Sequence, residues 1–150
     1  MRIILCLLIT VSSFANLVGE GKLEYGIFGI DLYNVRYYKT KKSSTIQLIY
    51  LRDIAKKYSI QGWQEGFKLN LGSNHTKYSA QIEWVIKNTP DVLEGDSLTI
   101  KIEGNKVELN KNKATIATRT DEKLAQIIHL PWIGPSPVDK ELKAKLLGQP

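Results

Sequence analysis

The chain has 150 residues, with 21 lysines and arginines against 15 aspartates and glutamates and a formal net charge of +6. The basic residues are spread along the chain rather than gathered on one face with interleaved aromatics, so this charge does not indicate nucleic-acid binding. The length fits one ordinary domain, and with Cys6 as the only cysteine its core must form without an internal disulfide.

The N-terminal residues have the order that is typical of an export signal. Arg2 supplies a positive charge, Ile3–Val11 form an apolar run too short for a membrane anchor, and the small residues of "SFA", ending at Ala15, fit a signal peptidase site. The alternative is a buried N-terminal strand. We expect a signal peptide over residues 1–15 and an exported domain over residues 16–150, periplasmic or secreted, with no stable membrane anchor after cleavage.

The first part of this domain is predicted to form strands and then a helix. Apolar and polar residues alternate in "KLEYGIFGIDLYNVRYY", and Thr45–Asp53 is rich in β-branched and aromatic residues, so two or three strands are expected. Asp53 is the predicted N-cap of a helix. Its apolar face would contain Ile60, Trp63, Phe67 and Leu71. Gly62 and Gly66 weaken this helix unless they let another group approach closely.

The next part reads as a second helix and a β-meander. Apolar residues from Tyr78 to Ile86 predict the helix, which should end near Asn88 because Pro90 disfavours helical geometry at Thr89. After it, three short alternating segments are separated by turns, as in a meander. Their residues are Leu98–Ile102, Val107–Leu109 and Ala114–Thr118.

Two helices are predicted at the C-terminal end. Asp121 caps the first, and His129 at its end is expected to be a cation that suits the helix dipole. In the stretch "HLPWIGPSPVDKELKAKLLG", Ser136 is the predicted N-cap of the last helix, with Pro137 at its first position, and Gly148 is its left-handed C-terminal cap. Trp132 is interpreted as a wedge that pins the connection onto the core. Together these elements predict an α+β domain with helices on an antiparallel sheet.

Few residues could carry catalytic chemistry. His75 and His129 are the only imidazoles, and neither lies near a nucleophile or a set of metal ligands, so we expect no metal site, no serine triad and no cofactor. The remaining candidates are phenols and cations. They are Lys22, Tyr33, Arg36, Tyr37, Tyr38, Tyr50, Arg52 and Tyr58. Such groups could bind an anion, and the alternative is that the tyrosines only cover a half-exposed sheet.

Four stretches resemble the chalcone isomerase-like superfamily, in particular its short exported bacterial branch. They are "LVGEGKLEYGIFGIDLYNVRYY", "LIYLRDI", "NTPDVLEGDSLTI" and "LPWIGPSPVDKELKAKLLG". The resemblance covers most of Leu17–Gly148. It implies an open-faced β-sandwich, in which helices cover an antiparallel sheet and a ligand cleft lies between the layers.

The resemblance also implies which residues could act in that cleft. In the plant isomerases, an arginine after a Gly-x-Gly pair stabilises the developing oxyanion during ring closure, and in related fatty-acid-binding proteins an arginine and a tyrosine hold the carboxylate. Here Lys22 or Leu23 replaces that arginine, and Tyr33 matches the tyrosine of the fatty-acid-binding branch. Lysine lacks arginine's planar fork, so the departure speaks against isomerase chemistry. Tyr58 matches a tyrosine of the enzyme cleft.

Three hypotheses follow for the function. The first is a non-catalytic exported domain that binds a small amphipathic or fatty-acid-like ligand, with Lys22 and Tyr33 as anion contacts and Arg36, Arg52 and Tyr58 as weaker candidates. The second is a cofactor-independent isomerase of the chalcone isomerase type, in which Lys22 and tyrosine hydroxyls stabilise an oxyanion. The third is a structural or partner-binding envelope protein, expected if the cleft is filled by its own side chains.

Overall fold

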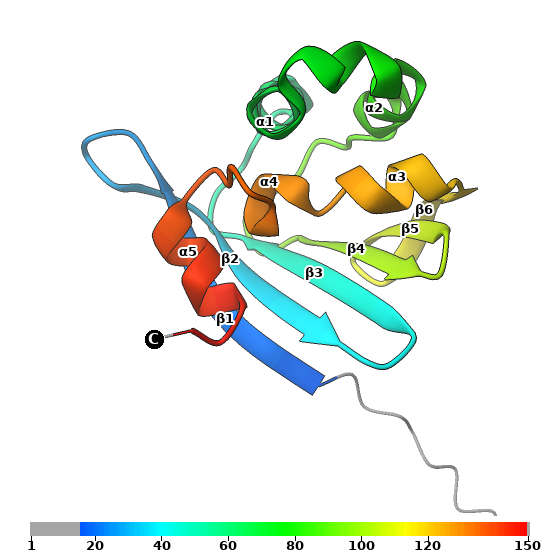
Figure 1. Ribbon diagram of the computed structural model, residues 1–150. Coiled ribbons are helices and arrows are strands. Elements are labelled where there is room, and N and C mark those ends of the chain that lie inside the picture. The colour runs from blue at the N-terminus through cyan, green and yellow to red at the C-terminus, as the bar shows by residue number, and fades with distance from the viewer. Residues whose placement is uncertain (1–15, 150) are drawn as a thin grey trace, which may run out of the picture.

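The computed structural model describes residues 16–149, which form a six-stranded sheet and a set of helices on one of its faces (Figure 1). The predicted signal peptide, residues 1–15, lies outside the described residues. All neighbouring strands are antiparallel and follow chain order, from β1 to β6. The strands are β1 (Asn16–Tyr25), β2 (Ile30–Lys39), β3 (Ser43–Tyr50), β4 (Ser97–Glu103), β5 (Lys106–Lys111) and β6 (Ala114–Thr120). The predicted α+β class and the predicted meander are both confirmed.

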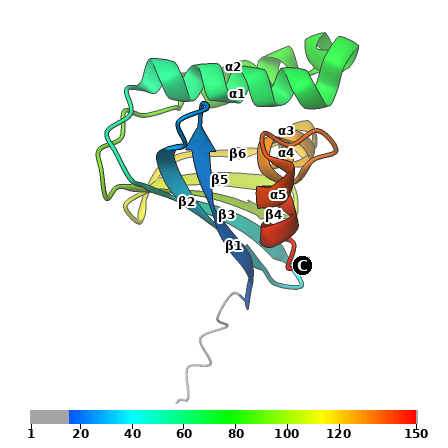
Figure 2. The same cartoon turned by 90° about the vertical axis from the view of Figure 1, so that its left-hand side faces the viewer.

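The helices form two layers above the sheet (Figures 1 and 2). The outer layer contains α1 and α2, the middle layer contains α3 and α4, and α5 packs on β1. Their bounds are α1 (Lys56–Leu71), the 3₁₀ helix η1 (Gly72–Tyr78), α2 (Ser79–Lys87), α3 (Glu122–Ile127), α4 (Leu130–Ile133) and α5 (Lys140–Leu146). Within residues 16–149, no helix is long and apolar enough to cross a membrane.

The core lies where the middle layer meets the sheet. Val35, Ile46, Ile100 and Val107 point up from four neighbouring strands and are fully buried, because alternate residues of a strand face the same side. Side chains of the helices close over them. These are Phe67 of α1, Val85 of α2, Leu124 and Ile127 of α3, and Leu146 of α5.

Close backbone approaches fix how the helices sit. A Cβ atom at Gly66 would lie 2.7 Å from Cβ of Pro131, so this glycine lets α1 rest directly on α4. Gly19 and Gly21 play the same part for α5, because a side chain at Gly19 would overlap the carbonyl oxygen of Lys145 and one at Gly21 would meet Leu142. The Gly-x-Gly pair therefore serves helix packing on β1.

The predicted start of α1 is wrong. The helix begins at Lys56 with Ala55 as its N-cap, and the Asp53 carboxylate instead accepts a hydrogen bond from the backbone N–H of Glu94, 2.8 Å away. This long-range bond ties the β3–α1 connection to the segment before β4. The predicted end near Asn88 of the second helix is confirmed, since α2 ends at Lys87 with Asn88 as its C-cap.

The predicted start of the last helix is also wrong. Asp139, and not Ser136, is the N-cap of α5, and its carboxylate accepts from the backbone N–H of Leu142. The backbone of Ser136 is held instead by Asn70 of α1, whose side chain accepts from the Ser136 N–H and donates to its carbonyl. Gly148 has a φ of 67°, which confirms the left-handed C-terminal cap.

His129 is a buried neutral side chain and not the predicted helix-end cation. It lies between α3 and α4, and its Nε2 donates to the carbonyl oxygen of Ile100, 2.9 Å away, in the tautomer that satisfies both groups. Burial lowers the pKa of the imidazole to about 4, against the small opposing effect of that hydrogen bond. The third predicted N-cap is confirmed, because the Asp121 carboxylate accepts a hydrogen bond from the backbone N–H of Leu124.

The two glycines of α1 should respond to substitution in opposite ways. Gly66→Ala forces α1 away from Pro131 and should lower the free energy of unfolding by about 1 to 3 kcal/mol. Gly62→Ala is the matched control, because a Cβ there meets nothing within 4 Å, and it should raise the free energy of unfolding by up to about 1 kcal/mol. Urea denaturation of both variants measures the difference, and equal effects would contradict the packing described above.

His129 should make the stability depend on pH. The unfolded chain protonates this imidazole near pH 6.5, but the folded chain only near pH 4, so its contribution is complete above pH 6.5 and is lost as the pH falls towards 4. The loss is about 3 kcal/mol of unfolding free energy. Urea denaturation at several pH values should show this slope reduced in His129→Gln and kept in His75→Gln. The same slope in both variants would contradict a buried neutral His129.

Candidate ligand-binding cavity

The middle layer covers only part of the sheet, and this leaves a cavity. In Figure 2, α3 and α4 lie under one half of α1, while the other half of α1 extends beyond them over the open end of the sheet. A cavity of about 710 Å³ lies in that place, between α1 and the ends of β1, β2, β3 and β4. Pro131 of α4 and Val138 also line it. The volume is within the range of small-molecule sites.

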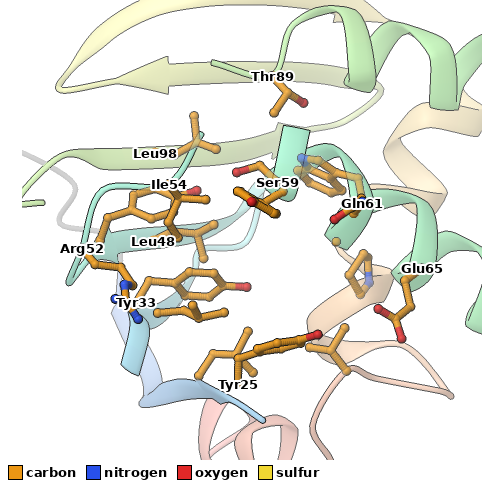
Figure 3. Close-up of a pocket in the computed structure, with 18 of the residues that line it drawn as sticks. Tyr25, Tyr33, Leu48, Arg52, Ile54, Ser59, Gln61, Glu65, Thr89 and Leu98 are labelled. Atoms are coloured by element: carbon orange, nitrogen blue, oxygen red, sulfur yellow. The ribbon is translucent and has the colours of Figure 1, made fainter. Parts of the chain in front are cut away.

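Most of the cavity wall is apolar (Figure 3). The sheet contributes aliphatic side chains from four strands, and α1 contributes Trp63 and Leu69. The aliphatic residues are Leu23, Ile30, Leu32, Leu48 and Leu98. Gly62 of α1 faces the cavity as well, which explains why a Cβ there would meet no atom within 4 Å. Gly62 thus enlarges the cavity, whereas Gly66 serves packing.

Tyr33 places a neutral hydroxyl inside this apolar space. Its oxygen accepts from Nε1–H of Trp132, 3.1 Å away, and its ring meets the edge of Tyr50 at a centroid distance of 5.5 Å. Burial raises the pKa of the Tyr33 phenol to about 12, although the Trp132 hydrogen bond opposes the shift. Within residues 16–149 no acceptor is found for the Tyr33 proton. The phenol can therefore donate to a ligand at any physiological pH.

Tyr50 offers a second phenol to the cavity. It is buried at the end of β3, and burial together with the neighbouring Tyr33 and Asp96 raises its pKa far above the usual range. Like Tyr33 it remains protonated, so the two rings present hydrogen-bond donors and no charge.

Arg52 supplies a cation at one side of the cavity. It lies two residues after the end of β3 and is exposed, and none of the ion pairs formed within residues 16–149 includes it. Glu65 of α1 lies on the opposite side of the cavity in Figure 3. The two other carboxylates of the wall are already engaged: Glu24 pairs with Lys22 at 3.5 Å, and Asp53 accepts from Glu94.

The structure brings together only three of the five predicted site residues. Tyr33, Arg52 and Tyr58 line the cavity. Lys22 and Arg36 do not, because they alternate onto the other face of the sheet, where Lys22 pairs with Asp31 at 3.0 Å and Arg36 with Glu20 at 3.1 Å. The sequence predicts a cavity that ends at Lys22 and Tyr33; the wall of this cavity includes Tyr33 and Arg52 but not Lys22.

Sequence reasoning missed several residues of this site. Tyr50 is among the phenols that could bind an anion but not among the five predicted site residues, and Trp132 is predicted only as a structural wedge, although its indole N–H holds the Tyr33 hydroxyl. Gly62 is the one residue of this group whose role the sequence could have indicated, since a glycine that weakens a helix needs a local reason. Nothing in the sequence indicates that Glu65 belongs to the site.

An α+β sandwich that is open on one face and encloses an apolar cavity under its helices defines the class of this molecule. The family model described as chalcone isomerase-like matches residues 29–148, and the chain belongs to that family. The crystal structure of a fatty-acid binding protein from Arabidopsis thaliana is similar, with a TM-score of 0.68 and 14% identity over 92% of this chain and 89% of that chain. At this identity the likeness shows the fold alone. The curated proteins contain no match.

Proposed function

We propose that the chain is an exported, non-catalytic domain that binds a small amphipathic ligand, such as a fatty acid, between the sheet and α1. The cavity carries this proposal: about 710 Å³ of mainly apolar space, with neutral phenol donors inside it and one unpaired guanidinium at its side. The similarity to a fatty-acid binding protein supports the same class of ligand.

The charges favour one orientation of such a ligand. An anionic head group near Arg52 would gain a charge-assisted hydrogen bond from the planar guanidinium. The opposite side of the cavity carries Glu65, whose carboxylate would repel the same head group. The aliphatic tail would then extend along the leucine side chains of the sheet, with Tyr33 as the donor for an oxygen deeper in the cavity.

No specific observation favours either of the two alternative functions. The isomerase hypothesis relied on Lys22 to stabilise an oxyanion, and Lys22 faces away from the cavity in an ion pair with Asp31. The hypothesis of a structural envelope protein expected a cleft filled by its own side chains, whereas the cavity is open.

The proposal of export is based on the sequence of residues 1–15. N-terminal sequencing of the protein from its cells should begin at Asn16.

Filling the cavity should weaken ligand binding without unfolding the domain. Gly62→Leu places a side chain into open cavity space and also removes a helix-weakening glycine, so the thermal midpoint should be kept or raised. Native mass spectrometry and titration with a long-chain fatty acid should show affinity reduced by about tenfold or more. Gln64→Leu, at a position of α1 outside the cavity wall, is the matched control and should bind like the wild type. A folded wild-type domain that takes up no ligand would contradict the proposal.

Arg52 should distinguish acids from uncharged ligands. Arg52→Gln should weaken binding of a long-chain carboxylic acid by about tenfold, because a charge-assisted hydrogen bond is lost, but hardly change binding of the alcohol of equal length. The control is Arg36→Gln, which removes a cation that pairs with Glu20 outside the cavity. Isothermal titration of both ligands measures the ratio. An equal loss for acid and alcohol would remove Arg52 from the head-group site.

A further inference from the structure

The hairpin between β1 and β2 ends in two large apolar side chains that contact almost nothing. Ile27 is 94% exposed and Phe28 is 88% exposed. They occupy the centre of a turn closed by a hydrogen bond from Gly29 N–H to the Gly26 carbonyl, and both glycines have positive φ. The glycines already satisfy the turn, and turn centres usually carry polar residues. The turn geometry therefore gives no reason for isoleucine and phenylalanine.

The hairpin tip stands beside the mouth of the cavity. The residues on either side of the turn, Tyr25 and Ile30, are themselves part of the cavity wall. Figure 1 shows the hairpin as a blue loop that projects beyond the sheet and α5. A surface that receives this tip would therefore also face the opening through which a ligand enters.

The other side of the same mouth carries cations and a tyrosine. Tyr58 lines the cavity at the start of α1, and the ammonium of Lys57 lies 4.9 Å from the centre of its ring. Arg52 lines the cavity as well, and Lys56 and Lys57 directly precede Tyr58 in the chain. All three cations are exposed, and none of them forms an ion pair within the described part of the chain. The opening therefore combines an apolar tip, tyrosines and cations. This combination is found where proteins contact the lipid head-group region.

We infer that the hairpin tip, Gly26–Gly29, inserts Ile27 and Phe28 into a lipid surface while Arg52, Lys56 and Lys57 contact anionic head groups, so that the cavity mouth opens onto the bilayer. The shape favours lipid over a protein partner, because a narrow tip presents too little area for a stable protein interface. Two inserted side chains give weak and reversible binding, which suits a domain that must load a ligand and leave. The purpose of this contact rests on the proposed function, but the contact itself can be measured without a ligand.

The test uses residues 16–150, the domain that the sequence predicts after removal of a signal peptide, because the apolar residues 3–11 would bind lipid by themselves. Within the described residues, the buried core lies between Val35 and Leu146. The probe is a set of vesicles of three parts phosphatidylcholine to one part phosphatidylglycerol. Co-sedimentation should show binding by the wild type and at least about tenfold weaker partition for the double variant Ile27→Ser with Phe28→Ser. That variant should keep the wild-type thermal midpoint, since both side chains are exposed.

A matched double variant controls for loss of surface hydrophobicity. Leu93→Ser with Ile116→Ser removes two exposed apolar side chains that lie outside the cavity wall, and it should sediment with vesicles like the wild type. Phe28→Trp adds a reporter at the tip, and its fluorescence should shift to the blue and be quenched by brominated lipid. Higher salt should weaken binding, because it screens the cations.

The outcomes separate this inference from the proposed function. Vesicle binding that needs the tip, in a domain that takes up no fatty acid, would support the inference and contradict the proposed function. Fatty-acid uptake with no vesicle binding, or with equal binding by the wild type and the tip variant, would overturn the inference alone. If sedimentation velocity shows self-association that depends on the tip, and no vesicle binding is found, the inference is overturned. The tip would then contact a second copy of the chain and not a lipid surface.

Discussion

The side chain of Trp132 connects all three layers of the molecule. Its ring stands edge-on against Trp63 of α1 at a centroid distance of 5.1 Å, and its indole N–H donates to Tyr33 of β2 at 3.1 Å. Because it is buried and comes from α4, it joins the outer helix layer, the middle layer and the sheet at one point. The cavity begins beside this point. Trp132 is therefore both the expected wedge and the residue that orients the main hydroxyl of the cavity, so its loss would affect binding as well as stability.

The cavity exists because the middle layer is short. α4 ends at Ile133, and Asn70 then holds the chain at Ser136 while it turns towards α5. Nothing from this layer covers the sheet under the first half of α1, and Gly62 adds no side chain there. The lack of a filling side chain reduces packing in this region but leaves a mainly apolar site with one unpaired cation, Arg52, in its wall. Such a site can select a ligand by shape and by one charge.

Much of the fold could be predicted from local sequence signals. The meander, the Asp121 cap and the Gly148 cap depend on residues within a few positions of each other, and these predictions are confirmed. The errors share a physical cause. Asp53 and Ser136 looked like helix caps, but partners distant in the sequence, Glu94 and Asn70, bind them instead.

The site was harder to predict, because side-chain direction depends on which face of the sheet is covered. Lys22 and Arg36 carry the same positive charge as Arg52, but the strand alternation sends both to the uncovered face. His129 is predicted to be a helix-end cation because its burial between α3 and α4 cannot be read from the sequence around it. Tyr33 was predicted from the family resemblance, and the structure places it in the cavity wall.

The central claim is that this cavity is a ligand site, and a crystal structure of residues 16–150 grown with a long-chain fatty acid tests it most directly. The account predicts electron density for an extended chain between α1 and the sheet, with the carboxylate nearer to Arg52 than to Glu65. An empty cavity in crystals that contain the acid, or a cavity closed by movement of α1 onto the sheet, would contradict it.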